Sequence, residues 1–158
     1  MKRIDLGQTI QILANIGVVV GIAFLALEMR LNRELLRAEI HQSRADTFIS
    51  NRQAVADSEF LLPVLVKLET PGTIFDPMAV DSLDEIEKAR VLRYFQAIYA
   101  DYDNQHYQYR LGFLDENFYQ SRVVRSIRTL APIWRQLGIT DQGTPEFQAE
   151  IERIVSAE

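Results

Sequence analysis

The sequence contains no cysteine and only two histidines, His41 and His106. The lack of cysteine excludes disulfides, thiolate metal sites and a cysteine nucleophile. The motifs of serine hydrolases, zinc proteases and P-loop nucleotide-binding proteins are also missing. Asp103 and His106 stand three residues apart, as in carboxylate-bridged metal bundles, but no second carboxylate accompanies His41 at that spacing. We therefore predict no catalytic activity, no cofactor and no metal site.

Charge is missing from Leu6 to Leu27, and Ile16–Leu27 is apolar throughout. A helix over this stretch would be about 33 Å long, enough to cross a hydrocarbon core of about 30 Å. We therefore predict a transmembrane anchor in residues 1–29. Two alternatives are a buried helix of a soluble bundle and a cleaved signal peptide, for which Lys2 and Arg3 would form the basic n-region. No small residues mark a plausible cleavage site, which argues against the signal peptide.

Few basic residues precede this span, and more follow it. Lys2 and Arg3 stand before it, whereas Arg30, Arg33, Arg37 and Arg44 follow it closely. By the positive-inside rule the C-terminal domain should be cytoplasmic. The net charge of −5 and the isoelectric point of about 5.1 argue against nucleic acid as a partner.

Two glycines inside the span are separated by one helical turn. Gly17 and Gly21 form a G-x-x-x-G pattern, and Ala14 lies on the same face. Small residues at this spacing let another helix approach closely in lipid. We therefore predict a helix–helix contact here, with a membrane protein partner or with a second copy of the chain.

Glycine and proline are absent from Ile22 to Leu62, so the helix should continue well past the lipid. A heptad seam follows it, made of Leu31, Leu35, Ala38, Gln42, Ala45, Ile49, Arg52 and Ala56. Further helices are predicted over residues 60–68, 83–111, 116–130 and 145–156. The fold class is therefore all-α: an N-terminal transmembrane helix that continues into an antiparallel bundle of about five helices, with residues 30–158 as the bundle domain.

Local signals predict the ends of these helices. Ser82 and Glu85 have the spacing of a capping box, and Asp115 and Thr144 are expected N-caps. Gly112 is expected to end the 83–111 helix in the left-handed conformation. Pro132 is expected to end or kink the helix that precedes it.

Two surface hypotheses concern polar clusters. The Tyr94–Tyr109 stretch is rich in aromatic and polar residues, and Tyr99, Tyr102, Asp103 and His106 are a candidate ligand or partner patch. The alternative is that these rings pack in the core with their polar atoms at its rim. Arg122, Arg125 and Arg128 repeat every three residues and are a candidate patch for anionic headgroups or for an acidic partner such as the segment 76–87.

Two patches, Asn15–Asn32 and Tyr107–Glu116, carry a resemblance to a known group. They resemble a widespread set of uncharacterised bacterial proteins that have one N-terminal membrane helix and a small helical domain. The resemblance implies a single-pass protein of the bacterial inner membrane. It also implies that Tyr107–Glu116 is a structural turn in which Arg110 and Asp115 pair across Gly112. The group has no agreed activity to transfer.

Two functions follow as hypotheses. The first is a structural or interaction role, as an accessory or scaffolding subunit of a membrane complex or as a homo-oligomer. The second is a small-ligand binding or sensing domain that uses the Tyr94–Tyr109 helix.

Overall fold

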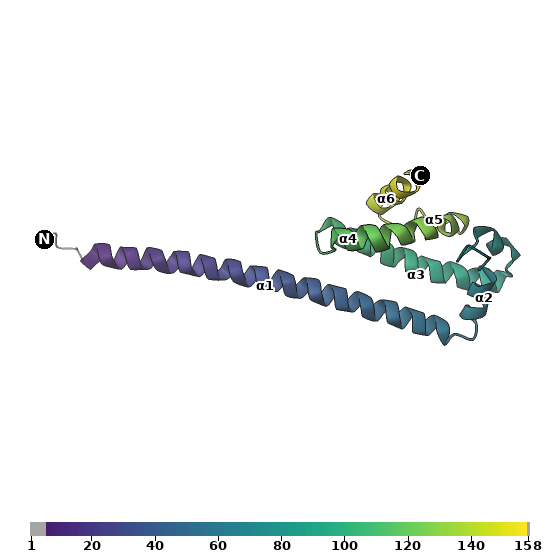
Figure 1. Cartoon of the computed structure of the whole chain (residues 1–158), viewed down its shortest axis with the longest axis horizontal. Helices are drawn as coiled ribbons and strands as arrows, with labels where there is room; N and C mark the ends of the chain where they lie inside the picture. The colour runs from purple at the N-terminus through teal and green to yellow at the C-terminus, as the bar shows by residue number, and fades with distance from the viewer. Residues whose placement is uncertain (1–5, 158) are drawn as a thin grey trace. The chain divides into compact units, whose positions relative to one another are not determined.

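The computed structural model describes residues 6–157, and the regular structure within them is helical (Figure 1). Its elements in chain order are α1 (Leu6–Ala56), α2 (Leu61–Lys67), η1 (Pro77–Ser82), α3 (Glu85–Arg110), α4 (Glu116–Phe118), η2 (Tyr119–Val124), α5 (Arg125–Gln136) and α6 (Pro145–Ser156). Beyond the helices, the described residues form one isolated β-bridge, between Thr70 and Thr73. The all-α prediction is confirmed. Lys2 and Arg3 lie outside the described residues.

α1 is a single unbroken helix of 51 residues. It is long and apolar enough to cross a membrane, with a mean hydropathy of 2.4 in its most apolar window. Its large apolar side chains from Ile10 to Leu27 are more than half exposed. The members of the heptad seam with large apolar side chains, Leu31, Leu35 and Ile49, are exposed as well.

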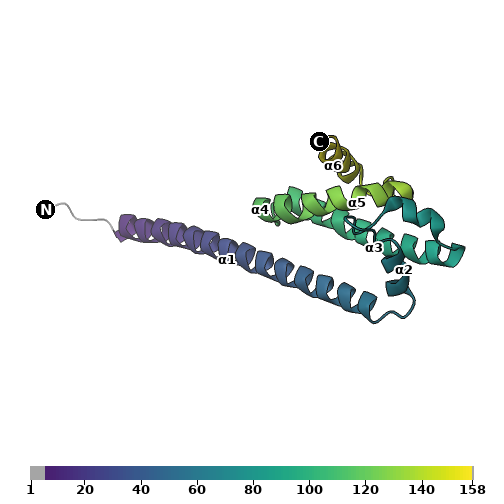
Figure 2. The same cartoon turned by 45° about the vertical axis from the view of Figure 1, so that its right-hand side comes forward.

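The chain divides into two compact units, of which one ends at Ala45 and the other begins at Asp46. In the second unit, α3 and α5 lie side by side and α6 packs on α5 (Figures 1 and 2). Short η1 also packs on α5, and α2 packs on α3. The hydrophobic core between these elements is built around Trp134, Tyr119, Phe95, Phe147 and Ile127, none of which is more than 2% exposed.

Three predicted helix ends are confirmed. Asp115 accepts a hydrogen bond from the Phe118 backbone N–H, and Thr144 accepts one from Phe147. Gly112 follows α3 with φ +73°, a conformation that only glycine adopts without strain. The last helix begins at Pro145 and ends at Ser156, as predicted.

The predicted capping box at Ser82 is wrong, because the box lies two residues later. Asp84 accepts from the Glu87 backbone N–H, and the Glu87 carboxylate accepts from the Asp84 backbone N–H. Ser82 instead ends η1, where its hydroxyl donates to the Ala79 carbonyl. Both pairs have the right spacing, and the extra 3-10 turn of η1 selects the second.

Of the two outcomes expected at Pro132, an end or a kink of the helix, the end is wrong. Pro132 lies inside α5, which continues to Gln136 and is followed by Gly138 at φ +64°. Its ring is on the exposed side, while its neighbours Ala131 and Ile133 are buried. Burial of that face keeps the helix intact even though proline cannot donate a hydrogen bond.

Candidate functional site

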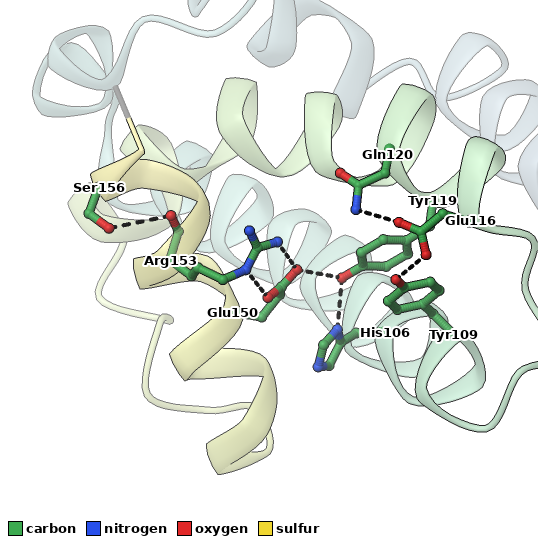
Figure 3. A network of polar contacts seen from close by, with 8 residues as sticks. All are labelled: His106, Tyr109, Glu116, Tyr119, Gln120, Glu150, Arg153 and Ser156. Carbon is green, nitrogen blue, oxygen red and sulfur yellow. Dashed lines mark hydrogen bonds and ion pairs between the residues drawn. The ribbon is translucent and has the colours of Figure 1, made fainter.

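A chain of polar side chains joins three elements of the second unit at one buried point (Figure 3). α3 supplies His106, η2 supplies Tyr119, and α6 supplies Glu150 and Arg153. We call these four residues the His106 network. His106 is 6% exposed and Tyr119 is wholly buried, so their polar atoms need partners inside the protein.

The hydrogen bonds of the network form a continuous path. His106 Nδ1 lies 2.7 Å from the Tyr119 hydroxyl oxygen. That hydroxyl donates to Glu150 Oε1 at 3.2 Å, so the His106 Nδ1–H donates to the tyrosine oxygen. Arg153 closes the path with two donor nitrogens on the Glu150 carboxylate, at 2.6 and 2.7 Å.

The local π-helical turn places Tyr119 in this path. Tyr119–Val124 is π-helical, which widens the backbone between α4 and α5. The Tyr119 ring stacks on Tyr109 with centroids 3.9 Å apart and planes 5° from parallel. The Tyr109 hydroxyl in turn hydrogen-bonds the Glu116 carboxylate, which also accepts from Gln120 at 2.9 Å (Figure 3).

Burial and charge set the protonation states of the network. Burial lowers the pKa of His106 below its ordinary 6.5, the Glu150 carboxylate opposes this, and Arg110 adds to it. Burial and the neighbouring Glu150 carboxylate raise the pKa of Tyr119. Burial alone would raise the pKa of Glu150, but the ion pair with Arg153 outweighs it and the pKa is lowered. At neutral pH the network therefore holds a neutral imidazole, a phenol and one paired carboxylate.

The predicted patch of Tyr99, Tyr102, Asp103 and His106 does not form one surface. Its side chains contact either the aromatic core or the N-cap of α6. Tyr99 is buried edge-on against Trp134, with ring centroids 5.0 Å apart, and its hydroxyl donates to the Thr140 carbonyl at 2.7 Å. Burial and the nearby Asp103 raise the Tyr99 pKa to about 12. The Tyr102 ring lies 5.8 Å from that of Trp134.

Asp103 holds the beginning of α6. Its carboxylate accepts from the Thr144 backbone N–H at 2.8 Å and from the Thr144 hydroxyl at 2.6 Å. The Thr144 hydroxyl oxygen meanwhile accepts from Phe147, so Asp103 supports the N-cap rather than replacing it. Three of the four predicted residues thus serve aromatic packing or this cap, and His106 alone belongs to the polar network.

The predicted pairing of Arg110 with Asp115 is wrong. Arg110 forms an ion pair with Glu146 of α6 at 3.2 Å, whereas Asp115 caps α4. The capping bond holds the Asp115 carboxylate over the first turn of α4, and α6 brings Glu146 to Arg110 from 36 residues further along the chain.

The other predicted residues lie on exposed surfaces. Arg122, Arg125 and Arg128 are exposed along η2 and α5, and none forms an ion pair with another described residue. The proposed pairing of this stripe with the acidic segment 76–87 is therefore not present within the described chain. Gly17 and Gly21 are exposed on α1, and a Cβ at either would meet no atom within 4 Å.

The described residues 6–157 hold no metal cluster beside the His106 network. No group of three or more potential metal ligands occurs among these residues. One surface hollow of about 360 Å³ lies between the Thr140 loop and α6, and its lining does not include the network residues. No family model, curated protein or solved structure matches the chain.

Sequence reasoning missed Tyr119, Glu150 and Arg153. Tyr119 is 13 residues from His106 and 31 from Glu150, so local spacing gives no indication of their contact. The one available signal was the position of Glu150 and Arg153 three apart on a predicted helix. Chemically, the network is suited to cross-linking α3, η2 and α6 and to responding to protonation of His106.

Proposed function

We propose that this chain is a membrane-anchored interaction protein without catalysis of its own. It would act as an accessory or scaffolding subunit of a bacterial membrane protein complex, or as a homo-oligomer. Residues 1–29 would be its single-pass anchor in the inner membrane, with the C-terminal domain on the cytoplasmic side. The observation that carries this proposal is α1, whose apolar window has a hydropathy of 2.4 and is 0% buried.

The exposure of its apolar side chains favours a membrane span over the core helix of a soluble protein. A helix that is hydrophobic on all sides is stable in water only when it is covered. Val18, Val19 and Phe24 point to three sides of α1, and each is at least 61% exposed. Lipid covers such side chains on every side at once, which supports the membrane location.

The face formed by Ala14, Gly17 and Gly21 supports a contact between helices. Neither glycine has a positive φ, and neither lies against another part of the described chain. The fold itself therefore does not require glycine at these positions. Close approach of a partner helix does require it, since a side chain there would hold the two backbones apart.

Membrane fractionation followed by purification in a mild detergent tests the proposal. We expect the full-length protein in the membrane pellet, with a stoichiometric protein partner or a second copy retained. A Gly17→Leu, Gly21→Leu variant should lose that partner, while the matched Val18→Leu, Val20→Leu variant should keep it. Recovery in the supernatant without detergent, or a monomer without a partner, would contradict the proposal.

No observation favours the ligand-binding alternative to the same degree. Tyr99 and Tyr102 pack against Trp134, and the Tyr99 hydroxyl donates to the Thr140 carbonyl. Asp103 accepts from Thr144, so these three side chains have partners within the described chain.

A further inference from the structure

α2 is apolar except for Lys67, yet only half of its apolar side chains are covered. Its sequence is Leu-Leu-Pro-Val-Leu-Val-Lys. Val64 and Leu65, with Leu68 just after the helix, are buried against the core. Leu62 and Val66, one turn apart on the opposite side, are 41% and 53% exposed. A helix with this pattern has an apolar face that its own domain leaves without a partner.

Contacts with α3 extend this face. The Arg90 guanidinium lies over the Phe60 ring at 5.0 Å, and Ile86 is one turn before Arg90 on α3. At the other end of α2, Lys67 forms an ion pair with Glu87, the neighbour of Ile86. Phe60 and Ile86 are 63% and 64% exposed. We call Phe60, Leu62, Val66 and Ile86 together the α2 surface.

The charges around the α2 surface are mostly negative. Residues 57–90 contain eight acidic residues and three basic residues, a net charge of −5. Of the basic residues, Lys67 is paired with Glu87 and Arg90 lies over the Phe60 ring. Glu59, Glu69 and Glu85 are exposed and form no ion pair with another described residue.

This combination selects among possible occupants. The acidic residues around the α2 surface, which we call the acidic rim, would repel an anionic membrane surface. A second α2 surface would bring an equal negative charge against it. A helix with leucine-like side chains on one face and lysine or arginine along its edges would satisfy both the apolar face and the rim. We propose that the α2 surface docks a basic amphipathic helix of a partner protein.

This inference rests on the proposed interaction role and names the chemistry of the partner. Its test uses the full-length protein in nanodiscs of zwitterionic lipid, titrated with a fluorescent 18-residue leucine–lysine amphipathic peptide. Empty nanodiscs give the lipid background. We expect a Leu62→Gln, Val66→Gln variant to bind about tenfold more weakly than the wild type, since two apolar contacts are lost.

Matched controls separate this surface from general attraction to an acidic protein. Leu111→Gln removes an equally exposed leucine, at 52%, from the other end of α3 and should leave binding unchanged. Glu69→Gln should weaken binding, whereas Asp46→Asn, also at an exposed acidic position, should not. A peptide with glutamate in place of lysine should not bind.

Equal binding by wild type and the Leu62→Gln, Val66→Gln variant would overturn the inference, as would equal binding of the glutamate peptide. So would loss of a homodimer in that variant, which would assign the surface to a second copy. Anionic lipid that shields a Val66→Cys label from a water-soluble thiol reagent would assign it to the membrane. The titration needs no cellular partner, so its failure leaves the co-purification test of the proposed function untouched.

Discussion

Tyr119 is the residue on which the polar contacts of α3 and α6 converge. Its hydroxyl contacts both His106 and Glu150, while its ring stacks on Tyr109. Removing the hydroxyl would leave the packing intact and take away one partner from each neighbour. The buried imidazole N–H would then have no acceptor, and an unsatisfied buried donor lowers the free energy of unfolding.

We therefore expect Tyr119→Phe to destabilise the protein by about 1–3 kcal/mol. The measurement is urea unfolding of the full-length protein in a non-ionic detergent, followed by circular dichroism. Tyr107→Phe, at a position 56% exposed on α3, is the control and should change stability by less than about 0.5 kcal/mol. Equal stability of the two variants would show that the Tyr119 hydroxyl carries no net stabilisation.

His106 gives the fold a pH dependence of predictable sign. Its pKa is lowered in the folded state by burial, with Arg110 and Arg153 assisting and Glu150 and Asp103 opposing. The unfolded chain therefore binds more protons just below pH 6.5, and stability falls as the pH decreases through this range. The lowered pKa of Glu150 adds a separate loss only further down, below about 4.5.

We expect the urea midpoint to decrease between about pH 7.5 and pH 5.5, where histidine titrates and carboxylates stay ionised. His106→Gln should flatten this decrease. His41→Gln, which removes the only other histidine of the sequence, should retain it. The same pH dependence in the His106→Gln variant would assign it to another group.

At the scale of elements, the loop before α6 is held against α3 by a close approach. A Cβ at Gly143 would lie 2.8 Å from Tyr99 Cε1 and 2.9 Å from its hydroxyl oxygen. Tyr99 cannot easily move, because it is packed between Trp134 and Phe147 and bonded to the Thr140 carbonyl. The position thus excludes side chains through packing rather than through an unusual φ.

Gly143→Ala should destabilise the protein by about 1–3 kcal/mol, as expected for overpacking. Urea unfolding measures it, with Gln142→Ala in the same loop as the control. Gln142 is exposed, and its side-chain oxygen accepts an exposed hydrogen bond from the Gln96 amide at 2.9 Å, so its replacement should have little effect. A neutral Gly143→Ala would mean that the loop shifts without cost.

Local sequence signals predicted where helices begin more reliably than they predicted where a helix is interrupted. Thr144 with Pro145 and Asp115 are caps that act within four residues, so the sequence alone predicts them. Ser82 and Asp84 compete for one cap, and the turn of η1 decides between them. Pro132 was expected to end or kink a helix, but the helix does not end there, because burial of Ile133 and Trp134 outweighs its missing N–H.

The π-helical turn and the contacts of His106 had no local signature. The π-helical turn covers Tyr119–Val124, and the partners of His106 come from segments 13 and more residues away. The same long separations explain why Arg110 pairs with Glu146 and not with Asp115. Tertiary packing, which the sequence pattern does not report, decides each of these contacts.

At the scale of the whole molecule, the orientation of the proposed membrane anchor is open to a direct test. The chain has no cysteine, so one introduced cysteine is a unique label. We expect Leu111→Cys, at an exposed position of the second unit, to react with a membrane-impermeant maleimide only after the cells are permeabilised. The physical reason is the larger number of arginines after the span. Labelling of intact spheroplasts would reverse the predicted orientation.

The indole of Trp134 is the only one in the sequence, is wholly enclosed, and its Nε1–H has no hydrogen-bond acceptor within the described structure. Few polar groups around an excited indole in such surroundings can reorient. Its fluorescence emission should therefore lie at short wavelengths and be insensitive to quenchers. Water that reached the aromatic rings around Trp134 would shift this emission to longer wavelengths before the helices unfold.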